Sequence, residues 1–104
     1  MTTDEQIFHI RRWGEDVGIT GENGKGTAPR QYHKLLEEVG ELGEALMLGD
    51  AIETIDAIGD CAVVLILLAQ LKGLRFEECL QSAYDVIKGR SGTMVDGAFV
   101  KEGD

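Results

Sequence analysis

A strongly apolar stretch near the middle of the chain constrains the fold more than any other feature. Within Cys61–Leu71 every residue except Gln70 is apolar. The stretch belongs to a helical pattern over Ala51–Lys72, which begins after a capping Asp50 and ends before Gly73. A helix that is apolar on nearly all sides is buried on nearly all sides. We therefore expect this helix at the centre of the structure, with the rest of the chain packed around it.

Hydrophobic residues recur at helical spacing in three further segments, each bounded by residues typical of helix ends. A glycine-rich stretch, 19–28, is expected to be a loop, and Asp96-Gly97 between two β-prone runs is typical of a hairpin over 93–100. The sequence thus predicts an all-α fold, a four-helix bundle with a small C-terminal β-hairpin. The predicted helices are Asp4–Val17 with Thr3 as its N-cap, Pro29–Leu48, Ala51–Lys72 and Phe76–Lys88.

The size and charge of the chain limit the classes of protein to which it can belong. Its 104 residues, 43% of them apolar, suit a single domain spanning residues 1–104. With 19 acidic against 10 basic residues the formal net charge is -9, which disfavours nucleic acid and membrane surfaces as partners. The longest apolar run is too short to cross a bilayer and no secretion leader opens the chain, so we expect a cytoplasmic protein.

One interval of the chain carries only negative charges. Between Lys34 and Lys72 there is no Lys, Arg or His, so acidic pairs at i, i+4 spacing repel each other. If the helices on either side of Gly49 pack antiparallel, the carboxylates approach one another and need a cation; the alternative is a solvated acidic face. Ligation by oxygen alone favours Mg²⁺ or Mn²⁺, with Ca²⁺ as a competitor. The acidic residues are Glu37, Glu38, Glu41, Glu44, Asp50, Glu53, Asp56 and Asp60.

The central helix also predicts a homo-oligomer. Four short helices give a chain of this length a small core, and the central helix has more apolar faces than its neighbours can cover. Its outer residues Ile52, Ile55 and Ile66 are expected to need a second copy of the chain, in a dimer or a tetramer.

Two segments of the acidic interval resemble a known family. The sequence KLLEEVGELGEA at 34–45, followed by DAIGD at 56–60, is similar to the MazG-like, all-α nucleoside triphosphate pyrophosphohydrolases, and to their compact phage-type members in particular. The family pattern is E-E-x-x-E on one helix and E-x-x-D on the next, and the likeness extends over essentially the whole chain. One position departs from it. The first acid of E-x-x-D falls on Ala57, which leaves Asp56 or Glu53 to supply the missing carboxylate, and Asp56 is favoured because it shares a face with Asp60.

The resemblance implies hydrolysis of a (d)NTP between its α- and β-phosphates, with two or more Mg²⁺ ions and Mn²⁺ as a substitute. The implied metal ligands are Glu37, Glu38, Glu41, Asp56 and Asp60, and the implied catalytic residues are Glu37, Glu38, Glu41 and Asp60. Either Glu37 or Glu41 would activate the attacking water. The candidate substrate contacts are Trp13, Gln31, Lys34, Lys88 and Arg90; Trp13 is otherwise a core residue, and the last two otherwise cap a helix.

Two alternatives remain open from the sequence. A phosphoribosyl-ATP pyrophosphohydrolase has a similar acidic bundle, and a non-catalytic acidic module would bind metal without turnover. The sequence does not determine which base is preferred, and dGTP is the first substrate to test because some phage-type relatives remove it.

Overall fold

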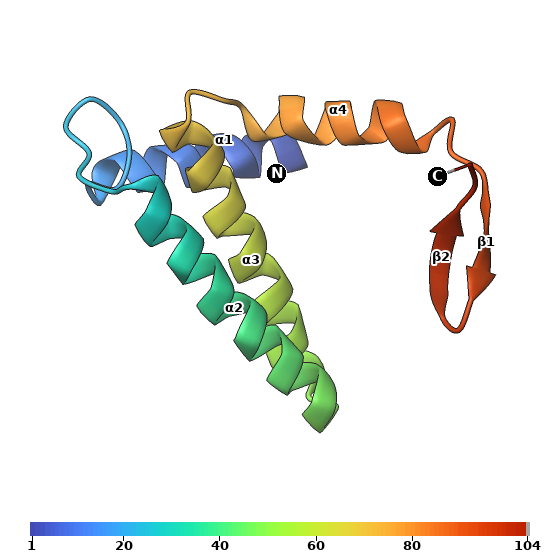
Figure 1. Cartoon of the computed structure of the whole chain (residues 1–104). Helices are drawn as coiled ribbons and strands as arrows, with labels where there is room; N and C mark the ends of the chain where they lie inside the picture. The colour runs from blue at the N-terminus through green and yellow to red at the C-terminus, as the bar shows by residue number, and fades with distance from the viewer. Residues whose placement is uncertain (104) are drawn as a thin grey trace.

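A computed structural model of the protein describes residues 1–103. Four helices are followed by one antiparallel hairpin, which confirms the predicted fold, and each predicted boundary lies within one residue of the observed one (Figure 1). In the hairpin Thr93 pairs with Val100 and Met94 with Phe99. The elements are α1 Thr3–Asp16, α2 Ala28–Leu48, α3 Ala51–Leu71, α4 Phe76–Ile87, β1 Gly92–Val95 and β2 Ala98–Lys101.

The start of α1 differs from the prediction by one residue. Thr2, not Thr3, is the N-cap, because its hydroxyl accepts a hydrogen bond from the backbone N–H of Glu5 at 3.1 Å. The Glu5 carboxylate in turn accepts from the N–H of Thr2 at 3.1 Å, which completes a capping box. A glutamate three residues after the cap can reach back in this way, and this favours Thr2 over its neighbour.

A short turn holds α2 and α3 antiparallel and side by side along their length (Figure 1). Gly49 ends α2 in the left-handed conformation, with φ 67°, which costs glycine little. Asp50 begins α3 by accepting a hydrogen bond from the N–H of Glu53 at 3.0 Å. Ala45 of α2 and Ala57 of α3 are both buried, and such small side chains allow two helices to approach closely.

The core lies at the C-terminal half of α3, where α1 also packs. Ile7 of α1 is buried together with Val64, Ile66 and Leu67 of α3. The expectation that Ile66 is an outer residue was wrong, because its own chain already covers it. The approach of α1 requires Gly14, because a Cβ there would meet a methyl of Leu67 at 2.5 Å. The N-terminal half of α3 therefore packs mainly on α2, while the C-terminal half carries the hydrophobic core.

A charged pair connects α1 with α4. Arg11 donates two hydrogen bonds to the carboxylate of Glu77, at 2.7 and 3.1 Å, and Arg75 donates a third at 3.1 Å. The hydrogen bonding by Arg11 is the main reason why the pKa of Glu77 is lowered to about 2. Within Phe76–Ile87 no residue is buried, so this pair is a principal tie between α4 and the rest of the chain.

The helices show two further features. Within the described residues, none of the helices is both long enough and apolar enough to span a membrane. The two cysteines, which lie in apolar helical patterns, are free thiols; Cys61 is half-buried, but Cys79 is exposed on α4.

We predict that Glu77→Gln lowers the free energy of unfolding by about 2 kcal/mol, because charge-assisted hydrogen bonds to Arg11 are lost. Glu78→Gln is the matched control, since it removes the same charge from the first turn of α4 without touching that pair. Because the pKa of Glu77 is depressed from 4.5 to about 2, its contribution is complete above pH 4.5 and is lost as the pH falls towards 2. Urea unfolding at pH 7 and pH 3 measures both effects, and equal losses in the two variants would contradict the assignment.

Candidate metal centre

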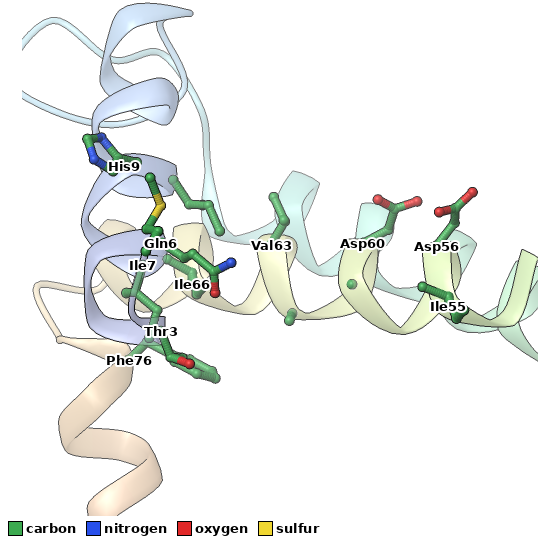
Figure 2. A pocket seen from close by; sticks show the side chains of 14 residues that line it. Thr3, Gln6, Ile7, His9, Ile55, Asp56, Asp60, Val63, Ile66 and Phe76 are labelled. Carbon is green, nitrogen blue, oxygen red and sulfur yellow. The ribbon is translucent and has the colours of Figure 1, made fainter. Parts of the chain in front are cut away.

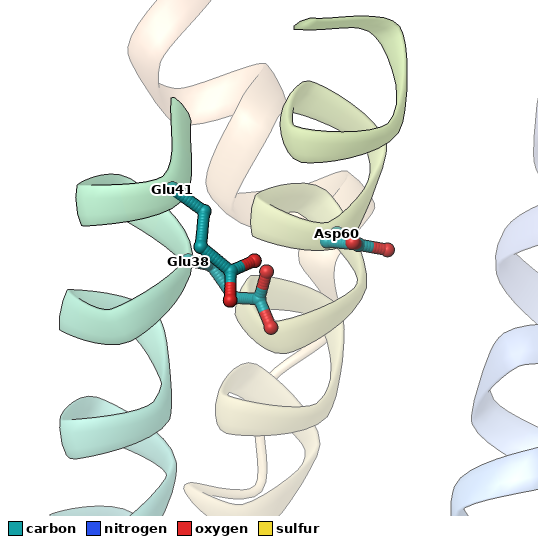
Figure 3. Close-up of side chains that lie close together, drawn as sticks. All are labelled: Glu38, Glu41 and Asp60. Carbon is teal, nitrogen blue, oxygen red and sulfur yellow. The ribbon is translucent and has the colours of Figure 1, made fainter. Parts of the chain in front are cut away.

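Three carboxylates meet where α2 faces α3. Glu38 and Glu41 lie one turn apart on α2, and the antiparallel packing brings Asp60 of α3 beside them (Figure 3). One oxygen from each of the three lies within 4.8 Å of the others. We call these three residues the carboxylate cluster. Glu38 is buried, whereas Glu41 and Asp60 are exposed, so the cluster has a closed side and an open side.

The buried member of the carboxylate cluster is only partly compensated. Lys34, one turn before Glu38, lies 3.2 Å from its Oε1 atom, and this pairing raises the pKa of the lysine. The Oε2 atom of Glu38 is also buried, and among the described residues it has no hydrogen-bond partner. A buried carboxylate oxygen without a partner is costly, so this atom indicates a missing cation more directly than the exposed acids do.

The electrostatics of the carboxylate cluster are repulsive. The negative charge of Glu38 is the main reason why the pKa of Glu41 is raised, and Asp60 adds to the effect. A divalent cation removes this repulsion by binding all three carboxylates. Oxygen ligands suit Mg²⁺ or Mn²⁺, and three carboxylates leave coordination positions for water or for substrate phosphates.

Glu37 and Asp56, two of the predicted ligands, lie outside the carboxylate cluster. Glu37 is half exposed and pairs with His33 at 3.2 Å and with Lys34 at 3.6 Å. Asp56 lies one turn before Asp60 and points to the same side of α3, along a groove between α1 and α3 (Figure 2). Within residues 1–103, neither Glu37 nor Asp56 belongs to the group of carboxylates whose oxygens lie within 4.8 Å of one another. Their role as metal ligands therefore stays a prediction.

Two acids that precede Ala57 in α3, Glu53 and Asp56, are the candidates to replace the missing family acid. Ala57 is buried against α2 and offers no ligand atom. Glu53 lines a hollow of about 210 Å³ together with Glu41, whereas Asp56 lines a groove together with Asp60. Each alternative acid therefore neighbours a different member of the carboxylate cluster.

A second groove, of about 370 Å³, adjoins the carboxylate cluster, and we call it the Trp13 groove. It brings together three of the predicted substrate contacts, although they come from different elements. Trp13 of α1 is 50% exposed, so it is not a core residue. Helical spacing from Asp60 predicts Val63 on the same side of α3, and Val63 lies in the wall. Sequence reasoning did not identify Ile19, because it comes from an irregular loop with no such signal. The groove is lined by Trp13, Ile19, Gln31, Lys34, Glu38, Asp60, Val63, Val64 and Leu67.

The other two predicted substrate contacts lie elsewhere. Lys88 pairs with Asp85 at 3.1 Å and lies over the ring of Tyr84. Neither Lys88 nor Arg90 belongs to the described residues that form the carboxylate cluster or line the Trp13 groove. Figure 1 shows the reason, because α4 runs away from α2 towards the hairpin. In a single chain these two cations do not reach the site.

Comparisons with known proteins identify a family model and a phage relative. The family model described as phosphoribosyl-ATP pyrophosphohydrolase matches residues 20–85, which include the whole carboxylate cluster. An uncharacterized 18.2 kDa protein from the rep-hol intergenic region of Haemophilus phage HP1 is 41% identical over 66 residues. The alignment covers 62% of this chain and 37% of the phage protein, so the chain spans little more than a third of that relative. No solved structure matches the chain.

We predict that Mn²⁺ binds the wild-type protein and raises its melting temperature, because the cation removes the repulsion within the carboxylate cluster. Glu38→Gln should weaken Mn²⁺ binding at least tenfold, measured by calorimetric titration. Glu44→Gln, the same charge change farther along α2, is the control and should bind as wild type does. Equal affinity in the Glu38→Gln and Glu44→Gln variants would show that the acids form only a solvated face.

Proposed function

The chain belongs to the phosphoribosyl-ATP pyrophosphohydrolase family, and on that premise we propose that it hydrolyses a (d)NTP to the monophosphate and pyrophosphate. The family supports pyrophosphohydrolase chemistry, and the predicted MazG-like resemblance agrees with it at the level of the superfamily that contains both. The observation that carries the proposal is the buried, unpartnered Oε2 of Glu38 at the carboxylate cluster, beside a groove of a size that suits a nucleoside.

The carboxylate cluster provides the binding site for the cofactor. Glu38, Glu41 and Asp60 would hold one Mg²⁺ or Mn²⁺ ion, and Asp56 or Glu53 would supply a ligand to a second. When bound, the ions offset the charge of the triphosphate and polarise the phosphoryl group under attack. The open side of the carboxylate cluster leaves room for the phosphates to complete the coordination.

Glu37 is suited to position the attacking water. It precedes Glu38 on α2 but lies outside the carboxylate cluster, so it can act on a water molecule without giving up a cluster ligand. Its neighbours His33 and Lys34 hold its side chain at the edge of the site. Glu41, the other acid considered for this role, is a member of the cluster and is better used as a ligand.

The Trp13 groove would hold the nucleoside. The indole of Trp13 offers a face on which a base can stack, and the amide of Gln31 can both donate and accept hydrogen bonds. Phosphoribosyl-ATP carries a second phosphorylated ribose and needs more cations, whereas Lys34 in this groove is already paired with Glu38. This favours an ordinary (d)NTP over the substrate named in the family description, and dGTP is the first to test.

We predict Mg²⁺- or Mn²⁺-dependent turnover of at least one (d)NTP, with monophosphate and pyrophosphate as the products. A panel of the eight common NTPs and dNTPs, with phosphoribosyl-ATP in parallel, tests this by chromatography. Glu38→Gln, Glu41→Gln and Asp60→Asn should each lower kcat by about a hundredfold or more, because each removes a ligand of the charge-neutralising ion. Glu44→Gln is the control. Formation of a nucleoside diphosphate and orthophosphate would contradict the proposal. Metal binding without turnover of any nucleotide would favour a non-catalytic module.

A second comparison identifies the acid that replaces the family residue at Ala57. We expect Asp56→Asn to lower kcat by about tenfold or more and Glu53→Gln to have a smaller effect, because Asp56 shares the Asp60 side of α3. Steady-state kinetics at saturating Mg²⁺ measure both. A larger loss in Glu53→Gln would assign the role to the hollow beside Glu41 instead.

A further inference from the structure

The two carboxylate oxygens of Glu38 have different surroundings. Its Oε1 atom lies 3.2 Å from the ammonium nitrogen of Lys34, whereas Oε2 is buried and finds no hydrogen-bond partner in the described part of the chain. The Glu38 side chain is 8% exposed, so water screens its charge poorly. Within residues 1–103, the cation that pairs with this buried carboxylate is therefore Lys34.

Lys34 also acts on the neighbouring acids. Its ammonium nitrogen lies 3.6 Å from Oε2 of Glu37. Its charge opposes the rise in the pKa of Glu41, which is caused mainly by Glu38, the cluster member beside Glu41 (Figure 3). A positive charge at this place offsets part of the repulsion within the carboxylate cluster when no metal ion is bound. The same charge repels a metal ion that approaches the same oxygens.

The side chain of Lys34 can leave this position. It is 51% exposed, and both of its ion pairs are made with residues of its own helix, at i+3 and i+4. It also lines the Trp13 groove together with Asp60, where the proposed function places the nucleotide. An ammonium group on a flexible four-carbon chain changes partners by rotation about side-chain bonds, so α2 need not move.

We propose that Lys34 is an exchangeable counter-ion, which pairs with Glu38 while the site holds no metal ion and turns to the phosphates when metal ion and triphosphate bind. In the first state Lys34 compensates the buried carboxylate. In the second state Lys34 leaves Glu38 to the metal ion and compensates a phosphate oxygen in the Trp13 groove. The buried carboxylate has a cation in both states. A metal ion that arrives without a nucleotide binds more weakly, because Lys34 then has no phosphate to turn to.

The second state rests on the proposed function, whereas the competition between Lys34 and a metal ion does not. The competition requires only the ion pair and the carboxylate cluster. The exchange predicts two effects of opposite sign. Removal of the lysine charge should strengthen metal binding to the free protein and should weaken the use of a nucleotide. A lysine that only supports the fold would weaken both.

Calorimetric titration of the full chain with Mn²⁺, in the absence of nucleotide, tests the competition. Lys34→Met should bind Mn²⁺ at least about threefold more tightly than wild type, because the competing charge is gone and the three carboxylates remain. Lys34→Arg keeps the charge and should bind as wild type does. Lys72→Met is the matched control, since it removes the same charge from an exposed residue at the end of α3. Equal or weaker Mn²⁺ binding by Lys34→Met would overturn the proposal.

Thermal unfolding gives a second measurement that does not depend on activity. Without metal, Lys34→Met should melt at a lower temperature than wild type, because Glu38 has lost its paired cation. Saturating Mn²⁺ should remove most of this difference, because the metal ion then compensates Glu38 in both proteins. A loss of stability that Mn²⁺ leaves unchanged would show a merely structural lysine and would overturn the proposal. If Lys34→Met does not fold, Lys34→Gln allows the same comparisons, since its amide can still donate a hydrogen bond.

Steady-state kinetics test the second state. With dGTP, or with the (d)NTP that wild type hydrolyses fastest, Lys34→Met should raise KM at least about tenfold at saturating Mn²⁺ and should lower kcat less. Lys34→Arg should restore most of the loss. An unchanged KM in Lys34→Met would overturn the turn towards the phosphates. A wild-type protein that is inactive on every nucleotide would refute the proposed function together with this second state, and the Mn²⁺ titration would still decide the competition.

Discussion

The close antiparallel packing of α2 on α3 is the constraint from which the site follows. Small residues at the contact, Ala45 and Ala57, let the helices approach, and the Gly49-Asp50 turn fixes their direction. With no basic residue in the interval 35–71, this approach brings negative charges together and buries one oxygen of Glu38 without a partner. The packing thus creates a local charge imbalance that a bound cation would correct.

The fold tolerates this charge imbalance because the hydrophobic core and the acidic residues lie at different halves of α3. Its C-terminal half is enclosed by α1 and carries the buried residues Ile66 and Leu67, so hydrophobic burial supports the fold there. Its N-terminal half packs on α2 and carries Asp60 and Asp56, close to solvent. A single helix therefore joins the hydrophobic core to the acidic site.

The C-terminal segment 76–101, which contains α4 and the hairpin, has no buried residue. The Arg11–Glu77 pair fixes the direction in which α4 leaves the core, yet α4 and the hairpin bury almost nothing of their own chain. Apolar side chains that stay exposed on such elements contribute little stability, because they forgo most of the burial that stabilises small domains.

The sequence by itself determined the helices, the hairpin and the acidic character of the candidate site. Helix boundaries depend on local spacing and caps, so they could be read within one residue, and the absence of basic residues from 35–71 already indicated a cation site. Only the tertiary structure decided which acids meet. Glu37 and Glu38 are adjacent in sequence, but about 100° separates their side chains around the helix, and contact with α3 buries one and leaves the other exposed. The Trp13 groove was beyond the sequence, because it depends on how α1 and an irregular loop pack on α3. The direction of α4 was equally beyond it, because it depends on contacts between residues far apart in the chain, among them the Arg11–Glu77 pair.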